Sequence, residues 1–236
     1  MQRILQPGEI EALDRIEFPR VRLPEPATLF ADRARRLRQL ATDEHPLRDY
    51  LRFAALLCDV QAQAAARVPA TPVDALAVER ALASGMPVVD PAESLDAGWR
   101  DALGLLLAAV IADGALPPPL LDTARSLRAL DAAALDDRAR AALRDDDASD
   151  ELAARPLLMA ALQVAFAGRA AGLAEHDVPA VEPVTVCPVC GSAPVASVLR
   201  IGGSASGSFS WSTCLRYVWQ LSQVSASTAG WPSMPR

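Results

Sequence analysis

Apolar residues recur with the period of an α-helix along most of the chain, up to about residue 173. After Pro26 the apolar positions Phe30, Ala34, Leu37 and Ala41 follow one another at 4-3-4 spacing, which predicts an amphipathic helix. Pro46 begins a second such pattern, and further apolar stripes cover residues 99–111, 120–130, 132–144 and 158–173. No run of alternating apolar and polar residues interrupts them. We therefore predict an all-α domain of six to eight helices over residues 1–176.

The longest apolar run, Ala102 to Ala112, covers about half of a helix that crosses a bilayer. It therefore predicts a buried core helix and no membrane insertion. The chain begins with Met1 to Leu5 and reaches Pro7 without the apolar core of a signal peptide. On these grounds we expect a cytoplasmic protein.

The charge balance bears on the class of partner. The chain has 29 acidic and 23 basic residues, a formal net charge of -6 and a pI near 5.0. Nucleic acids and anionic membranes both attract cationic surfaces. The composition therefore argues against a nucleic-acid partner.

The residues that could act in catalysis are few. His45 precedes Pro46 and is more typical of a helix cap than of a general base. His176 follows the last predicted helix beside Asp177, an arrangement common at solvated helix ends. The sequence has no GxSxG, no glycine-rich phosphate loop and no HExxH. We therefore expect no enzymatic activity and assign no catalytic residue.

Two other groups of residues could bind a ligand but have simpler structural interpretations. Cys58 lies on the apolar face of the second predicted helix, where a thiol packs as a small core side chain. The acidic run from Asp145 to Asp147 lacks the spacing of a calcium-binding loop. We predict a solvated loop between helices at this run.

The motif with the clearest chemical signal is a pair of cysteines followed by a glycine, Cys187-Pro188-Val189-Cys190-Gly191. Two thiolates three residues apart can bind one tetrahedral metal ion, and a glycine after the second cysteine permits the tight turn. The flanking residues 184–186 and 195–199 resemble short strands, as in a zinc-ribbon or rubredoxin-type knuckle. The alternative, a redox dithiol, requires the motif to begin a helix, which Pro194 opposes. We predict Cys187 and Cys190 as metal ligands, and the redox pair remains the alternative.

A tetrahedral site needs four ligands, and this chain offers only half of them in one motif. Beyond Cys190 there is only the isolated Cys214, and no second CxxC follows. We do not expect Cys58 or Cys214 to complete the site. The predicted fold is thus mainly α, with an N-terminal multi-helix domain followed by an incomplete rubredoxin/zinc-ribbon-like knuckle.

Three segments together resemble the formate dehydrogenase accessory protein family, FdhE. They are LFADRARRL (residues 29–37) with HPLRDYL (45–51), PLLMAALQVAFAGRAAGL (156–173), and CPVCGSAPVASVLRIGGSASG (187–207). The resemblance covers the chain from its start to about Gly207. Its specificity lies in the order and spacing of the segments.

The resemblance implies a cytoplasmic, chaperone-like maturation factor, which is not an enzyme. Such proteins assist the assembly of active respiratory formate dehydrogenase and contact its catalytic subunit. Their C-terminal halves carry several CxxC pairs in rubredoxin-like knuckles that bind iron, with zinc as the other candidate metal. Only Cys187 and Cys190 match that set here, so we expect weak metal binding in this chain. Two alternatives remain: a thiol-disulfide oxidoreductase that acts through this pair, and a zinc-ribbon binding module.

The C-terminal segment differs in composition from the rest of the chain. From Gly203 onward there is no Asp, Glu, Lys or His, and three of the four tryptophans lie there. Its prevalent residues have codons with G or C in the second position, as expected for a GC-rich gene read out of frame. We therefore predict three parts: the helical domain 1–176, the start of a knuckle 177–207, and an aberrant, disordered tail 208–236. A genuine Ser-rich tail is the alternative, and sequencing the gene distinguishes the two.

Overall fold

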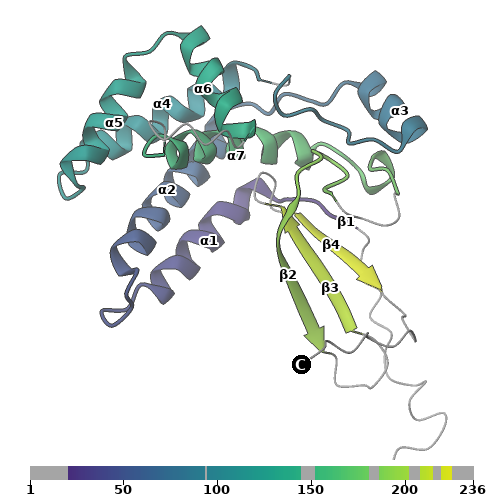
Figure 1. The fold of residues 1–236 in the computed structure, drawn as a ribbon, viewed down its shortest axis with the longest axis horizontal. Helices are drawn as coiled ribbons and strands as arrows, with labels where there is room; N and C mark the ends of the chain where they lie inside the picture. The colour runs from purple at the N-terminus through teal and green to yellow at the C-terminus, as the bar shows by residue number, and fades with distance from the viewer. Residues whose placement is uncertain are drawn as a thin grey trace, which may run out of the picture.

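The computed structural model describes residues 21–93, 95–144, 152–180, 186–201, 208–214 and 219–224, and from residue 194 onward it describes only the backbone. Figure 1 shows a body of helices with a sheet extending from it. The helices are α1 (Pro26–Leu40), α2 (Arg48–Arg67), α3 (Ala75–Ser84), α4 (Ala97–Ala112), α5 (Pro118–Arg128), α6 (Ala132–Arg144) and α7 (Arg155–Ala171), followed by the 3₁₀ turn η2 (Glu175–Asp177). The fold of the described residues is mainly α, as predicted.

Helices α4 and α7 form the centre of the body, because α7 buries apolar residues around much of its circumference and α4 buries one broad apolar face. They pack against each other, α2 packs against both, and α1 lies along α2. The predicted apolar run lies within α4 and supplies most of its buried residues, and α7 buries still more. The largest fully buried side chains include Trp99, Phe30, Phe166, Leu158 and Leu162.

A buried glutamine joins two of these helices. Gln61 of α2 is 2% exposed and donates from Nε2 to the carbonyl oxygen of Ala160 at 2.8 Å and to Oε1 of Gln163 at 3.1 Å. A buried amide is stable only where it is hydrogen-bonded. These bonds therefore fix the register of α2 against α7.

Helix α3 was missed by the apolar pattern, because Ala81 is its only buried residue among those described. Its ends carry the signals that could have revealed it. The Asp74 side chain accepts a hydrogen bond from the amide of Leu76, and Gly85 ends the helix in the left-handed region at φ 61°. In Figure 1, α3 stands at the edge of the helical body.

The strands form one antiparallel sheet in the order β1-β4-β3-β2. Their bounds are β1 (Val21–Arg22), β2 (Pro194–Ile201), β3 (Ser208–Cys214) and β4 (Trp219–Val224). The domain predicted as all-α thus contributes one strand, which is a correction. Because β1 has only two residues, it is too short to show alternation in the sequence.

The C-terminal strands differ from the disordered tail that we expected from residue 208 onward. Strands β3 and β4 pair over six residues of each, from Phe209 opposite Val224 to Cys214 opposite Trp219. Alternation of serine with Phe209, Trp211 and Thr213 suits a strand, because aromatic and β-branched residues favour extended backbone. Their side chains, and residues 215–218 and 225–236, lie outside the described part. The predicted frameshift stays a prediction.

No helix within the described ranges combines the length and the apolar character needed to cross a membrane.

Candidate functional site

The CxxC motif forms a closed turn, as its glycine suggests. The amide of Gly191 donates to the carbonyl oxygen of Cys187 at 2.8 Å, and the amide of Cys187 donates to the carbonyl oxygen of Ser192 at 2.8 Å. Gly191 adopts φ 68°, in the left-handed region that favours glycine. The second predicted strand is confirmed as β2, whereas residues 184 and 185 of the first lie outside the described residues.

This turn, residues 187–192, packs against the segment that follows α3. The amides of Val88 and Val89 donate to the carbonyl oxygens of Pro188 and Val189, at 3.3 and 2.8 Å. Val189 is fully buried, and Cys187 and Cys190 are 2% and 4% exposed. The turn is thereby joined to the hydrophobic core of the helical body.

Replacing Gly191 with alanine is expected to weaken this packing. A Cβ there would lie 3.3 Å from Cγ of Pro87, and the left-handed backbone disfavours any side chain. We expect a loss of about 1–2 kcal/mol in the free energy of unfolding and faster hydrogen exchange at the amide of Val89. Gly114→Ala is the control, since no atom of the described residues lies within 4 Å of its Cβ position. Equal stability of the two variants would contradict the expected strain.

The described residues do not complete a metal site around the two cysteines. The Sγ atom of Cys190 lies 3.2 Å from Oγ of Ser192. Within the described part of the chain, no group of three or more His, Cys, Asp or Glu side chains is placed to hold a metal ion. Two thiols are half of the set that a tetrahedral site requires. The assignment of Cys187 and Cys190 as metal ligands stays a prediction.

The backbone of the sheet brings one more cysteine to the same end of the molecule. In the β2–β3 register Cys214 is the partner of Pro194, four residues beyond Cys190. Its side chain lies outside the described residues. This placement could not be read from the sequence, where Cys214 stands alone.

Burial of the three described cysteines predicts slow reaction with alkylating reagents. Burial also raises the pKa of the Cys58 thiol above its ordinary value, which further lowers its thiolate fraction. In a Cys214→Ser variant, we expect labelling by iodoacetamide to be at least about 100-fold slower in the native protein than in urea. Mass spectrometry of digested samples measures this for each cysteine. Rapid native labelling of Cys187 or Cys190 would favour the oxidoreductase alternative, which requires an accessible thiolate.

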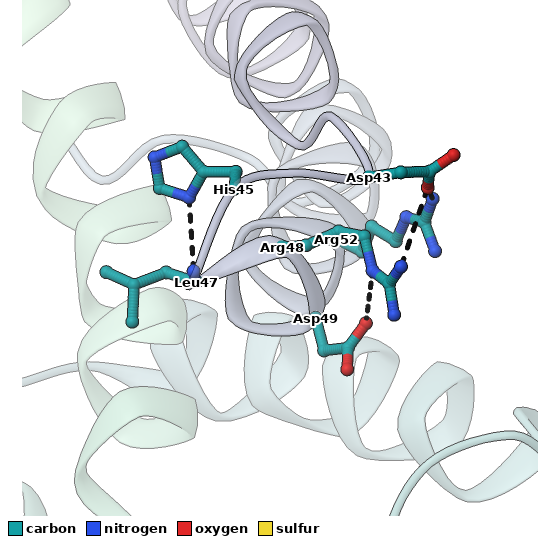
Figure 2. Close-up of polar contacts among 6 residues, drawn as sticks. All are labelled: Asp43, His45, Leu47, Arg48, Asp49 and Arg52. Atoms are coloured by element: carbon teal, nitrogen blue, oxygen red, sulfur yellow. Dashed lines mark hydrogen bonds and ion pairs between the residues drawn. The ribbon is translucent and has the colours of Figure 1, made fainter.

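His45 lies at the tip of the α1–α2 hairpin and serves the backbone there. Its Nδ1 accepts a hydrogen bond from the amide of Leu47 at 3.1 Å, just before α2 begins (Figure 2). Around it, Arg48 and Arg52 both pair with Asp43, and Arg48 also pairs with Asp49. His45 thus bonds to the backbone ahead of the helix and is not its cap, since the N-cap residue of α2 is Leu47 and no side-chain cap bond is present there.

The remaining sequence candidates lie at the surface or outside the described part. His176 is in η2, with a side chain 85% exposed and Nε2 3.5 Å from Oδ1 of Asp177. This matches the solvated helix end that was expected. Cys58 is buried on α2, also as expected. The acidic residues 145–147 fall outside the described residues.

A buried ion pair between α7 and the start of α4 was missed in the sequence. Nη2 of Arg169 lies 2.5 Å from Oδ2 of Asp96, and the Arg169 side chain is 9% exposed. Burial raises the pKa of the Asp96 carboxyl. The pKa of Asp96 is nevertheless lowered overall, because other interactions outweigh burial. They are the hydrogen bonds from Thr71, Arg169 and the Gly98 amide, together with the positive charge of Arg169. The apolar pattern of α7 gives no signal for a partner 73 residues away.

Arg169 also lines a groove beside α3. The groove has a volume of about 550 Å³ and is bounded by α3, the segment of residues 86–93 and Arg169. The Nε atom of Arg169 is buried and has no hydrogen-bond partner within the described part of the chain. The lining of the groove mixes charged residues, among them Asp74, Arg80 and Asp90, with apolar ones such as Val73 and Val88.

Two family models match the chain and together cover most of it. Residues 18–182 match the model described as FdhE, N-terminal, and residues 186–214 match the model described as FdhE, central domain. The second match continues to Cys214, beyond the Gly207 limit expected from the sequence.

Similar proteins and a similar solved structure agree with these matches. A protein FdhE homolog from Pseudomonas aeruginosa is 37% identical over 211 residues, covering 86% of this chain and 65% of that protein. Protein FdhE from Escherichia coli is 32% identical over 191 residues, covering 78% of this chain and 60% of that protein. The crystal structure of the FdhE protein from Pseudomonas aeruginosa superposes with a TM-score of 0.72 at 30% identity, covering 87% of this chain and 70% of that chain. The chain thus spans less than two thirds of the length of the two relatives compared by sequence, from Pseudomonas aeruginosa and Escherichia coli.

Proposed function

Because the chain belongs to the FdhE family, we propose that it is an accessory factor needed to assemble active respiratory formate dehydrogenase. It acts in the cytoplasm, without chemistry of its own, by binding the catalytic subunit of that enzyme. The observation that carries this proposal is the family match over residues 18–182, which spans the helical body from α1 to η2.

The helical body is the part suited to bind a partner. Its core packs α2, α4 and α7 together, so its surface is held rigidly. That surface exposes several large apolar side chains, which include Leu47 and Tyr50 at the hairpin tip and Leu76, Leu82 and Met86 on and after α3. Tyrosine is enriched among the residues that carry most of the binding energy at protein–protein interfaces, and methionine is enriched at such interfaces.

A genetic experiment tests the proposed function. The chain is expressed in a host that lacks its own FdhE, and formate dehydrogenase activity is measured beside a strain carrying the Pseudomonas aeruginosa relative. We expect activity above that of the empty strain. Activity no higher than the empty strain, with the chain present as folded protein and the relative effective, would contradict the proposal.

We propose iron, with zinc as the alternative, as the metal of the complete family site. Support comes from the paired thiols of Cys187 and Cys190 in a turn of the right kind. Since the described residues supply two ligands, binding in this chain is expected to be weak. Metal analysis of the purified chain after dialysis checks this expectation, and one tightly held metal ion per chain would contradict it.

A further inference from the structure

A short segment that follows α3, residues 86–89, lies against the CxxC turn and is called the lid below. The amide of Val88 donates to the carbonyl oxygen of Pro188 at 3.3 Å. The next amide, that of Val89, donates to the carbonyl oxygen of Val189 at 2.8 Å. The lid thus bonds to both residues that separate the two cysteines.

The two cysteines are almost completely covered while the lid is in place. Cys187 is 2% exposed and Cys190 is 4% exposed. Both belong to the same buried hydrophobic cluster as Val88 and Val89 of the lid. A thiol reagent or a soft metal ion must reach the sulfur atom itself. Reaction at either cysteine therefore requires an opening of the structure around the turn.

The lid is a direct continuation of α3. Gly85 alone separates them, and it ends the helix in the left-handed region at φ 61°. The amide of Met86, the first residue of the lid, donates to the carbonyl oxygen of Ala81 in α3 at 3.1 Å. Because of this bond and the short connection, a lid that moves away from the turn takes the end of α3 with it.

Helix α3 is also the helix that is held least firmly by the core. It buries one of its ten residues, Ala81, whereas α7 buries ten of its 17. Its strongest contact with another element is with the short η2. Residues 68–74 before it and 85–93 after it form neither helix nor strand. Segments with few buried apolar contacts open locally at a lower cost than the whole protein unfolds.

We propose that α3 and the lid, residues 75–89, open together as one unit, and that this opening admits a soft metal ion or a thiol reagent to Cys187 and Cys190. The rest of the helical body stays folded during the opening. The opening concerns access to the paired thiols, so it goes beyond the proposed function and does not depend on capture of a partner.

The opening is measured in the Cys214→Ser chain with two probes, iodoacetamide and phenylmercuric acetate. A thiolate displaces iodide from the first and acetate from the second, so each probe needs only one sulfur. Mass spectrometry gives the rates at Cys187, Cys190 and Cys58. Rates proportional to the reagent concentration report the population of the open form. Hydrogen exchange at the amide of Val89, followed by NMR, reports the same opening without a reagent.

Pairs of variants at two exposed positions separate opening of α3 from unfolding of the whole body. Glu79 and Asp101 are both exposed, and each is the fifth residue of its helix, α3 and α4. Each is replaced by alanine and by glycine. Within a pair both variants lose the carboxylate, and glycine destabilises the helix relative to alanine by a similar amount in both.

We expect Glu79→Gly to react about five-fold faster than Glu79→Ala at Cys187 and Cys190, with both probes. Hydrogen exchange at the amide of Val89 is expected to quicken by the same factor. The reaction of Cys58, which is buried on α2, is expected to be unchanged, as are all rates between Asp101→Gly and Asp101→Ala.

Three results would overturn the proposal. Equal rates in the two variants at position 79 would show that α3 does not take part in the opening. An equal increase at Cys58, or between the variants at position 101, would show that the thiols are reached only by unfolding of the whole body. Different factors at the thiols and at the amide of Val89 would show that the lid and the cysteines are uncovered separately.

Discussion

Trp99→Ala is expected to lower the free energy of unfolding by about 4 kcal/mol, enough to leave a marginally stable domain largely unfolded. Trp99 is 1% exposed in the middle of the core. Its Nε1 donates to Oδ1 of Asp136 at 3.1 Å, and the same oxygen accepts from Nη1 of Arg100 at 2.6 Å. The variant therefore loses a large buried ring and one bond of a network that ties α4 to α6. Urea denaturation followed by circular dichroism measures the change.

Two further variants show whether the loss comes from burial. Trp99→Phe keeps most of the apolar ring and loses the hydrogen bond, so we expect a smaller cost of about 1–2 kcal/mol. Leu76→Ala removes a side chain that is 62% exposed and is expected to change stability by less than about 0.5 kcal/mol. A cost for Trp99→Ala no greater than that for Leu76→Ala would show that α4 is not the centre of the core.

Asp96→Asn is expected to cost about 2–3 kcal/mol at neutral pH, because it leaves the Arg169 guanidinium buried without its counter-charge. Asparagine still caps a helix, so the start of α4 is preserved. Asp32→Asn is the matched control: Asp32 pairs with Arg35 at 2.7 Å on an exposed face, where the cost is below about 1 kcal/mol. Urea denaturation of the three proteins compares the two ion pairs.

The same pair predicts how stability depends on pH. The pKa of Asp96 is lowered from its ordinary value of 3.8 in the folded protein. The stabilisation is therefore fully present above about pH 3.8 and is lost as the pH falls through the folded-state pKa. The difference between wild type and Asp96→Asn should accordingly be constant at higher pH and shrink below that range. A difference that grew on acidification would contradict the lowered pKa.

The parts of the fold that the sequence predicted are those with a wide apolar stripe. Helices α1, α2 and α4–α7 each bury such a stripe, and their predicted ranges agree with the observed bounds to within a few residues. Helix α3 escaped prediction because it buries little, although Asp74 and Gly85 mark its ends. Strand β1 escaped because its two residues pair with β4, nearly 200 residues away in the chain. Local periodicity carries no information about such a partner.

The candidate site was predictable only in part. Spacing and the following glycine indicated a tight turn at Cys187 and Cys190, and the structure has that turn. Its packing against Val88 and Val89 depends on backbone groups, which the sequence does not distinguish. In the sequence, Arg169 is a polar residue near the end of an apolar helix, and nothing there marks it as buried. Its burial follows from the position of Asp96, a tertiary contact that no motif encodes.

Retention of the catalytic subunit of formate dehydrogenase by the immobilised chain tests the proposed function most directly. The full-length Pseudomonas aeruginosa relative serves as the positive control, and the Trp99→Ala variant serves as a destabilised negative control. The proposed function predicts that the wild-type chain retains the subunit and that the destabilised variant retains much less. No retention by the folded wild-type chain, under conditions in which the relative retains the subunit, would contradict it.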